Sequence, residues 1–414
     1  MTGLLFTILF FPLIGLAVSR IIGRVPLFLA GAGAWGAVLF VAASLRVPLI
    51  VAGAAAIFGA AVVLWRTRHP AVVERVKYPV LPTLLLGSIA GVLLTITAIV
   101  PLIDYDGRAF WLMKAKAIAH ERQVDGPYFQ NLTSATLRNE YPLLVPIDAA
   151  TVMFVASDLD DRHVRWLYVL VAISFALEVR RRFAAWFSEA IGAWSAVLLV
   201  ALPQIAIDVE GGAMSASCDL PLAAFVACAF FELVDGKSPG RLGFWIACAA
   251  LTKQEGLPFS LVLIAAAVAV FGRRAWIAAA PLAVAITSLL MWRARIPSSD
   301  EEDLTALLMT LPGQLDRVPD AVRIFGVYFV EWRDWGPFWI AVGIAAIWLM
   351  WRREWRSVGL ASAAIFPMMA MYVAVYSVTM WNTAELASVT AARLLTHFAG
   401  PAMFTIAAAV SRHE

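Results

Sequence analysis

Apolar runs long enough to cross lipid hydrocarbon recur along the whole sequence, and this recurrence limits the fold more than any other feature. A helix needs about 20 apolar residues to span the bilayer core. With 62% of its 414 residues hydrophobic and 15% charged, the chain carries more apolar surface than a soluble core can bury. In lipid, backbone polar groups must be satisfied within the protein, which favours helices. The sequence therefore predicts an all-α integral membrane protein.

The hydropathy pattern predicts a polytopic bundle of about 13 transmembrane helices. The first apolar run lacks the basic leader and cleavage site of a secretory signal, so we expect it to be retained. The predicted spans are 3–18, 26–44, 47–65, 80–103, 164–179, 183–207, 218–234, 241–253, 257–272, 274–292, 337–351, 357–379 and 394–410.

Basic clusters predict the orientation, because short cytoplasmic loops are rich in lysine and arginine. Placing all of these clusters inside puts the N-terminus outside and the C-terminus inside. The short apolar segment 143–157 then lies between two outer stretches, and we expect a juxtamembrane or re-entrant helix there. A full crossing by this segment would require another span to be wrongly assigned. The basic clusters are Arg20 with Arg24, 66–77, 180–182, Lys237 with Arg241, Arg273 with Arg274, and Arg352, Arg353 and Arg356.

This pattern divides the chain into four parts, with no internal repeat or linker to a soluble domain. The two sizeable polar segments both fall on the outer side, so we expect the functional residues there. The parts are N-terminal accessory helices 1–78, a core 79–292 that contains the first outer loop 104–142, a second outer loop 293–336, and C-terminal helices 337–414.

The charge and the cysteine spacing argue against nucleic-acid binding and against a zinc site. The net charge of +3 comes without a long basic block, which argues against nucleic acid as a partner. Cys218, Cys228 and Cys248 stand singly, without the spacing of a zinc site, and are predicted to be packing residues.

The first outer loop opens with two aspartates directly after a predicted span. Asp104 and Asp106 precede a helical pattern that carries Trp111, Lys114 and Lys116. Asp106 can cap that helix, or it can act as a general base with a pKa raised by burial. The lysines suit a surface helix with a cationic edge, in contact with lipid headgroups or with a substrate.

Polar residues also close this loop and begin a later span. Glu140 and Tyr141 precede Pro142, which marks a turn into the short apolar segment. Asp219 starts a predicted span, where it can cap the helix or belong to a site.

Two further clusters place charges at unusual positions. Lys253 and Glu255 interrupt an apolar stretch, where ionisable groups usually face a cavity or a partner. Side chains so close along a helix point apart, so we expect each to pair elsewhere. Arg393 lies just before the last span on the outer side, which makes it a candidate for binding an anion such as phosphate.

These pieces, in this order, resemble the GT-C superfamily of membrane glycosyltransferases, which includes protein mannosyltransferases and lipid A aminoarabinose transferase. The resemblance covers roughly residues 80 to 410 and does not include the first three spans. A sizeable C-terminal soluble domain, present in larger members, is missing. The motifs are Tyr-Asp-Gly-Arg-Ala-Phe-Trp-Leu-Met-Lys-Ala-Lys at 105–116, Tyr-Pro-Leu-Leu-Val-Pro at 141–146, Asp-Leu-Pro-Leu at 219–222, Thr-Lys-Gln-Glu-Gly at 252–256 and Arg-Leu-Leu at 393–395.

The resemblance implies transfer of a sugar from a polyprenyl-phosphate donor to an acceptor on the extracytoplasmic side of the plasma (inner) membrane. Asp106 then matches the catalytic base, and the substrate-binding candidates are Asp104, Lys114, Lys116, Glu140, Tyr141, Asp219, Lys253, Glu255 and Arg393. A sugar phosphate already has a good leaving group, so the reaction needs one base and positive charge for the phosphate. Single displacement would invert the anomeric carbon. We expect Asp106 and Asp219 to share one cavity, open towards lipid, with at least one of Lys116, Lys253 and Arg393.

Three alternatives remain open at this point. A transporter or lipid flippase would line a path through the midplane with charges. A structural subunit would bind the carrier lipid without turnover. A divalent metal would need the carboxylates of Asp104, Asp106, Asp219 and Glu210 to converge, and we expect no metal. The sequence does not predict which sugar is transferred or to which acceptor.

Overall fold

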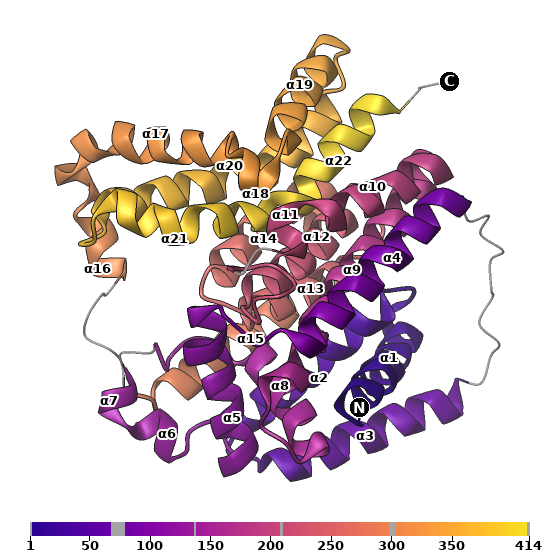
Figure 1. Ribbon diagram of the computed structural model, residues 1–414, viewed down its shortest axis with the longest axis vertical. Helices are drawn as coiled ribbons and strands as arrows, with labels where there is room; N and C mark the ends of the chain where they lie inside the picture. Colours follow the sequence, from indigo (N-terminus) through magenta and orange to yellow (C-terminus); the bar gives the residue numbers. More distant parts are fainter. Residues whose placement is uncertain (1, 68–78, 136–137, 208–209, 298–303, 412–414) are drawn as a thin grey trace.

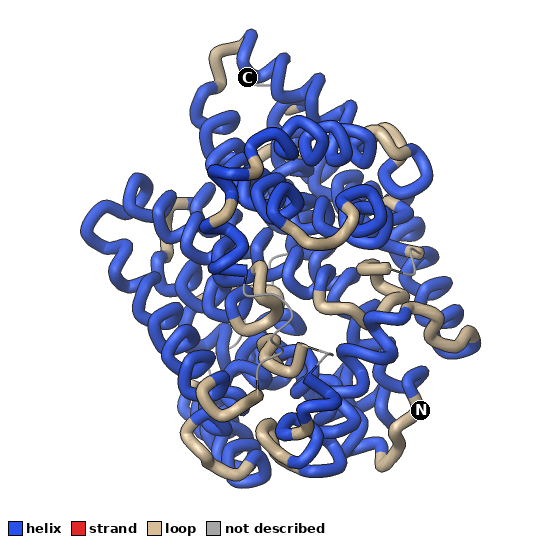
Figure 2. Tube along the Cα trace, turned by 90° about the vertical axis from the view of Figure 1, so that its left-hand side faces the viewer, coloured by secondary structure: helices blue, strands red, loops and turns tan. Residues whose placement is uncertain are grey.

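The structure is a computed structural model that describes residues 2–67, 79–135, 138–207, 210–297 and 304–411. Within these ranges the chain forms only helices, turns and loops, as the tube in Figure 2 shows. The prediction of an all-α membrane protein is confirmed at this level. Figure 1 shows the helices coloured along the chain, from α1 near the N-terminus to α22 near the C-terminus.

Seven helical stretches of the described chain are long and apolar enough to cross a membrane. Each predicted span overlaps a helix, but several of those helices are shorter than a bilayer crossing requires, so the number of spans stays a prediction. The seven are Thr2–Ile22, Leu27–Ser44, Leu49–Arg66, Val80–Ile99, Gly256–Arg293, Trp355–Val378 and Thr383–Val410.

The first four helices differ in how deeply they lie in the bundle. About two thirds of α2 is buried, against 11% of α3 and 17% of α4. Trp35 of α2 donates its indole N–H to Thr151 of the short helix α8 at 2.9 Å. The accessory helices therefore pack on the core through α1 and α2, whereas α3 and α4 present apolar side chains outwards, as expected for contact with lipid. The bounds are α1 Thr2–Ile22, α2 Leu27–Ser44, α3 Leu49–Arg66 and α4 Val80–Ile99.

The described residues of 104–142, the predicted first outer loop, fold into short helices and lead into the buried helix α8. A π-helical turn, η1, follows α4 and continues directly into α5. The backbone N–H of Leu144, at the start of α8, donates to the carbonyl of Leu251 at 3.0 Å. This bond joins the end of the first outer loop to the 252–256 segment. The bounds are η1 Asp106–Trp111, α5 Leu112–Glu121, α6 Pro127–Gln130, α7 Leu132–Ala135 and α8 Leu144–Ala156.

Helix α12 lies at the centre of the molecule. All of its residues from Asp219 to Leu233 are buried, against neighbours that include α9, α13 and α14. Such all-round burial fits its all-round apolar sequence. The bounds of this core are α9 Asp161–Trp186, α10 Glu189–Ala201, α11 Pro203–Ala206, α12 Asp219–Asp235, α13 Pro239–Ala250, α14 Gly256–Phe271, η2 Gly272–Arg274 and α15 Ala275–Arg293.

The second outer loop and the C-terminal helices pack on each other. Helix α17 lies against α20 and α21, and these three form an arm at one side of the bundle (Figure 1). Arg317 holds the arm by donating to the Thr379 carbonyl at 3.1 Å and to the Thr383 hydroxyl at 3.2 Å. The bounds are α16 Leu304–Met309, η3 Leu311–Gly313, η4 Leu315–Arg317, α17 Val318–Phe329, α18 Trp332–Trp335, α19 Phe338–Trp351, α20 Trp355–Val378, α21 Thr383–Leu395, η5 Thr396–Phe398 and α22 Ala399–Val410.

A buried ion-pair network joins three helices near the end of α12 that lies away from Asp219. Arg182 of α9 pairs with Glu178, at 2.7 Å, and with Glu232 and Asp235 of α12. Arg241 of α13 pairs with Glu232 at 2.8 Å. Because opposite charges are matched in contact, the cluster can stay ionised while buried.

Candidate functional site

One loop, residues 210–218, brings the first outer loop and the C-terminal helices together. A Cβ atom on Gly107 of η1 would lie 1.9 Å from the Ser215 carbonyl oxygen, and one on Gly211 would lie 2.7 Å from the Cβ of Arg393. Only glycine permits both approaches. The buried guanidinium of Arg165 completes the arrangement by donating to the carbonyls of Val100 and Met214.

Asp106 and Arg393, which are 287 residues apart in the sequence, form an ion pair at this junction. The side chain of Asp106 is 36% exposed and that of Arg393 is 14% exposed. The capping role goes to Asp104, whose carboxylate accepts the N–H groups of Asp106 and Gly107, each at 3.0 Å. The capping alternative for Asp106 is therefore wrong, and its carboxylate stays available at the surface of the junction.

Asp104 is buried beneath this turn, with 4% exposure. Burial, together with the neighbouring Asp106 carboxylate, raises the pKa of Asp104 to about 7. Near neutral pH this side chain therefore exchanges a proton directly beside Asp106. Asp104 therefore lies where it can position Asp106, beneath the surface that a substrate would contact.

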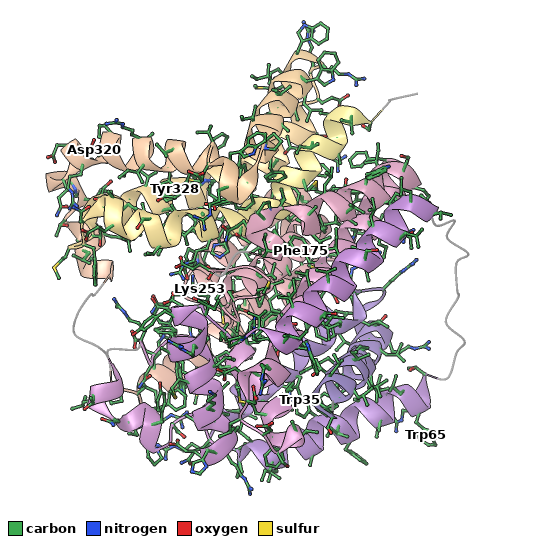
Figure 3. The ribbon with its side chains drawn as sticks, in the orientation of Figure 1. Trp35, Trp65, Phe175, Lys253, Asp320 and Tyr328 are labelled. Carbon is green, nitrogen blue, oxygen red and sulfur yellow. The ribbon has the colours of Figure 1, made fainter. Side chains whose placement is uncertain are left out.

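Asp219 and Lys253 form a second, more deeply buried pair at 2.7 Å. Lys253 also contacts Glu255 at 3.1 Å. The expectation that Lys253 and Glu255 point apart is wrong, because α13 ends at Ala250 and α14 begins at Gly256, so the segment between them is a turn. Lys253 lies in the middle of the molecule, between the first outer loop and the C-terminal helices (Figure 3).

His397 belongs to the same cluster and was not anticipated from the sequence. Its Nε2 lies 3.1 Å from the Asp219 carboxylate, and its Nδ1 lies 2.7 Å from the Tyr372 hydroxyl. The available signal was its position four residues after Arg393, since residues four apart share one helical face. Asp219 also accepts a hydrogen bond from Ser217 at 3.1 Å. Its carboxylate is therefore bound in tertiary contacts, and the capping alternative does not apply.

Three polar atoms around these two pairs are buried and have no hydrogen-bond partner within the described residues. They are Nε of Arg393, Oε2 of Glu255 and Oγ1 of Thr396. Buried polar groups are nearly always hydrogen-bonded in folded proteins. Beside the Asp106 and Asp219 pairs the described residues therefore leave two donors and one acceptor unsatisfied.

Lys114 is fully buried, so the prediction of a cationic edge that includes it is wrong. Its ammonium donates to the Arg138 carbonyl at 2.6 Å and lies 3.7 Å from the centre of the Phe110 ring, with the ring of Tyr141 at 5.3 Å. Residues two apart on a helix face different ways, and so only Lys116 reaches the partly exposed side. Burial lowers the pKa of Lys114 to about 7 and raises that of Tyr141 to about 12.

Replacing Lys114 by Met should change how stability depends on pH. The folded protein releases the Lys114 proton near pH 7, whereas the unfolded chain keeps it to about pH 10.5, so wild-type stability should gain up to about 1.4 kcal/mol per pH unit across this window. Lys114→Met should lack this gain. Thermal unfolding of both proteins at pH 6, 7, 8 and 9 tests this, and a constant difference between them would contradict it.

The remaining candidates lie apart from the two pairs. Lys116 forms an ion pair with Asp161 of α9 at 2.6 Å, so it does not join Asp106 and Asp219 as one of the expected cations. Glu140 approaches Arg293, which donates to its backbone carbonyl at 3.0 Å. The metal alternative gains no geometric support, since the described residues contain no group of three or more His, Cys, Asp or Glu side chains suited to a metal ion.

With this geometry in view, the chain was compared with known proteins. No family model, curated protein or solved structure matches it. A functional assignment therefore rests on the contacts of the site and on the chemistry that they allow.

Proposed function

We propose that this membrane protein transfers a sugar from a polyprenyl-phosphate donor to an acceptor at the membrane surface that bears Asp106. The observation that carries the proposal is the Asp106–Arg393 ion pair, which places a half-exposed carboxylate beside a cation. One base and one phosphate-binding cation are what displacement of a sugar from phosphate requires. We assign this surface to the extracytoplasmic side of the plasma (inner) membrane.

In this mechanism Arg393 and Asp106 separate when the donor binds. The donor phosphate offers Arg393 a second anion, and arginine binds phosphate well through its planar fork. Asp106 is then free to accept the proton of the acceptor hydroxyl as that oxygen attacks the anomeric carbon. The bond to the phosphate oxygen breaks as the new glycosidic bond forms, and the configuration inverts.

The Asp219–Lys253 pair places fixed charges close to the Asp106–Arg393 pair. Arg393 lies within electrostatic range of Asp219 as well as Asp106. Lys253 is held between Asp219 and Glu255, so its charge is already neutralised and Arg393 is the cation that binds the departing phosphate. The Oε2 atom of Glu255 is buried without a partner within the described residues, so it can accept a hydrogen bond from a sugar hydroxyl only after the site opens.

The charge distribution along α12 disfavours the transporter alternative. Charged groups lie near its two ends, at Asp219 and at Glu232, roughly 20 Å apart along the helix. The twelve positions between them, 220–231, carry apolar side chains and are all buried. A transport path would require ionisable groups near the midplane, and this central helix supplies none. The basic side chains Arg182 and Arg241 at the far end fit a cytoplasmic location.

Reconstitution in lipid vesicles with a panel of sugar-labelled polyprenyl phosphates tests the proposal. Membrane lipid extract serves as the source of acceptor. We expect free polyprenyl phosphate to appear while the label moves to a different molecule. If intact labelled lipid crosses the bilayer without any chemical change, the protein is a flippase and the transferase assignment fails.

A further inference from the structure

A pocket of about 530 Å³ lies where α4 leads into η1. Its wall begins at Ile99, the last residue of α4, and continues through Pro101 and Leu102 to η1. Helix α4 is mostly exposed and apolar, so it faces lipid along its length. The pocket therefore opens at the height where this helix leaves the hydrocarbon, which is where lipid headgroups lie. Its lining is Ile99, Pro101, Leu102, Arg108, Lys116, Leu159, Asp160, Asp161 and Arg162.

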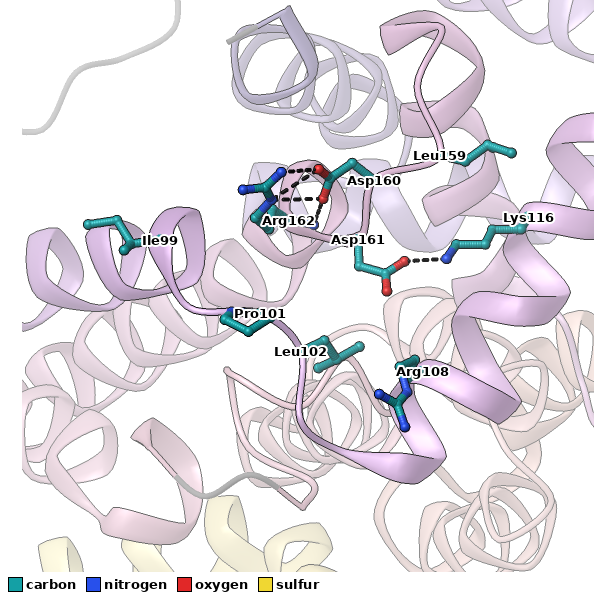
Figure 4. Close-up of a pocket in the computed structure, with 9 residues that line it drawn as sticks. All are labelled: Ile99, Pro101, Leu102, Arg108, Lys116, Leu159, Asp160, Asp161 and Arg162. Atoms are coloured by element: carbon teal, nitrogen blue, oxygen red, sulfur yellow. Dashed lines mark hydrogen bonds and ion pairs between the residues drawn. The ribbon is translucent and has the colours of Figure 1, made fainter.

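The polar lining carries one more positive than negative charge. Lys116 pairs with Asp161 at 2.6 Å, and Arg162 pairs with Asp160, as the dashed lines in Figure 4 show. Arg108 is exposed, and its side chain makes no hydrogen bond or ion pair within the described residues. An arginine free to bind, next to two pairs that already neutralise each other, gives the pocket a net attraction for an anion.

The apolar part of the lining favours a ligand that has apolar groups as well as a negative charge. Ile99 is 70% exposed and Leu159 is 46% exposed, so large apolar surfaces border the charged wall. A small inorganic anion would satisfy Arg108 but leave these surfaces in water. A molecule with a phosphate joined to acyl chains covers both, since burying apolar surface is favourable in proportion to its area.

We propose that this pocket binds the headgroup of an anionic phospholipid, with its phosphate on Arg108 and an acyl chain along Ile99 and Leu159. The bound lipid would hold the 100–105 connection between α4 and η1. The inference does not depend on the transfer activity, because no residue of the Asp106–Arg393 or Asp219–Lys253 pairs lines this pocket.

Lipid binding to the purified, delipidated full chain tests the proposal by native mass spectrometry. The probes are phosphatidylglycerol, phosphatidylcholine and inorganic phosphate. We expect retention of phosphatidylglycerol over phosphatidylcholine, and about tenfold weaker retention in Arg108→Gln, since a charge-assisted hydrogen bond is lost. Arg108→Lys should keep much of the preference, and Arg323→Gln, which removes an exposed arginine on α17, should keep all of it.

Three results would overturn this assignment. Equal retention of both lipids by the wild type would show that charge plays no part. An unchanged preference in Arg108→Gln, with folding verified by its thermal unfolding, would place the lipid elsewhere. Displacement of phosphatidylglycerol by millimolar inorganic phosphate would show a simple anion site without a contribution from the acyl chain.

Discussion

Asp106→Asn is expected to lower the rate of sugar transfer by about 10²–10⁴-fold, the usual contribution of a positioned general base. Asparagine keeps the size of the side chain and its oxygen, so Arg393 still has a neutral acceptor at the same place. The amide cannot take a proton from the acceptor hydroxyl. Initial rates of label transfer in vesicles, with donor binding measured separately, would show the loss in the chemical step while binding persists.

Asp125→Asn provides the matched control. Asp125 lies in the same outer loop, pairs with Arg295 at 2.9 Å, and has a side chain that is 29% exposed, close to that of Asp106. Its loss should leave transfer within about twofold of the wild type, as for a surface ion pair of small energetic weight. If both variants lose activity equally, or if Asp106→Asn retains full activity, Asp106 is not the base.

Arg182→Met is expected to lower the free energy of unfolding by about 3–5 kcal/mol, the usual effect of removing one partner from a buried ion pair. Arg182 is 4% exposed in its side chain and contacts Glu178, Glu232 and Asp235. The substitution leaves Glu178 and Glu232 with one arginine each. It removes the ion pairs between α9 and α12, and of the polar contacts described here only the hydrogen bond from Trp186 to Asp235, at 2.7 Å, still joins the two helices. Thermal unfolding in detergent, followed by intrinsic fluorescence, measures the change.

Arg181→Met is the control, because Arg181 contacts Glu178 alone and its side chain is 29% exposed. We expect an effect of about 0–1 kcal/mol for this pair. Below its unfolding temperature, Arg182→Met should still transfer sugar, since the network lies roughly 20 Å from Asp219 along α12. Equal destabilisation by both substitutions would contradict the central role of Arg182.

Predictions from the sequence were most successful for features that depend on one segment alone, such as its apolar length. Apolar length predicted the helices, and Asp219 was predicted at the start of a span, where α12 begins. Helical spacing predicted the wrong side-chain directions where the chain is not helical. The turn at 252–256 brings Lys253 and Glu255 together although helical spacing would part them.

The sequence by itself determined that the chain is an all-α membrane protein and that Asp106, Asp219, Lys253 and Arg393 are unusual. Periodicity and hydropathy act over one helix, so they reveal which residues are out of place. Which of these residues meet was decided only by tertiary packing, because the 210–218 loop sets η1 against α21 through contacts at two glycines. The same packing buried Lys114 under aromatic rings and separated Lys116 from the site, which no local pattern can specify. It also brought His397 to Asp219, where the spacing of four residues from Arg393 was the one local signal.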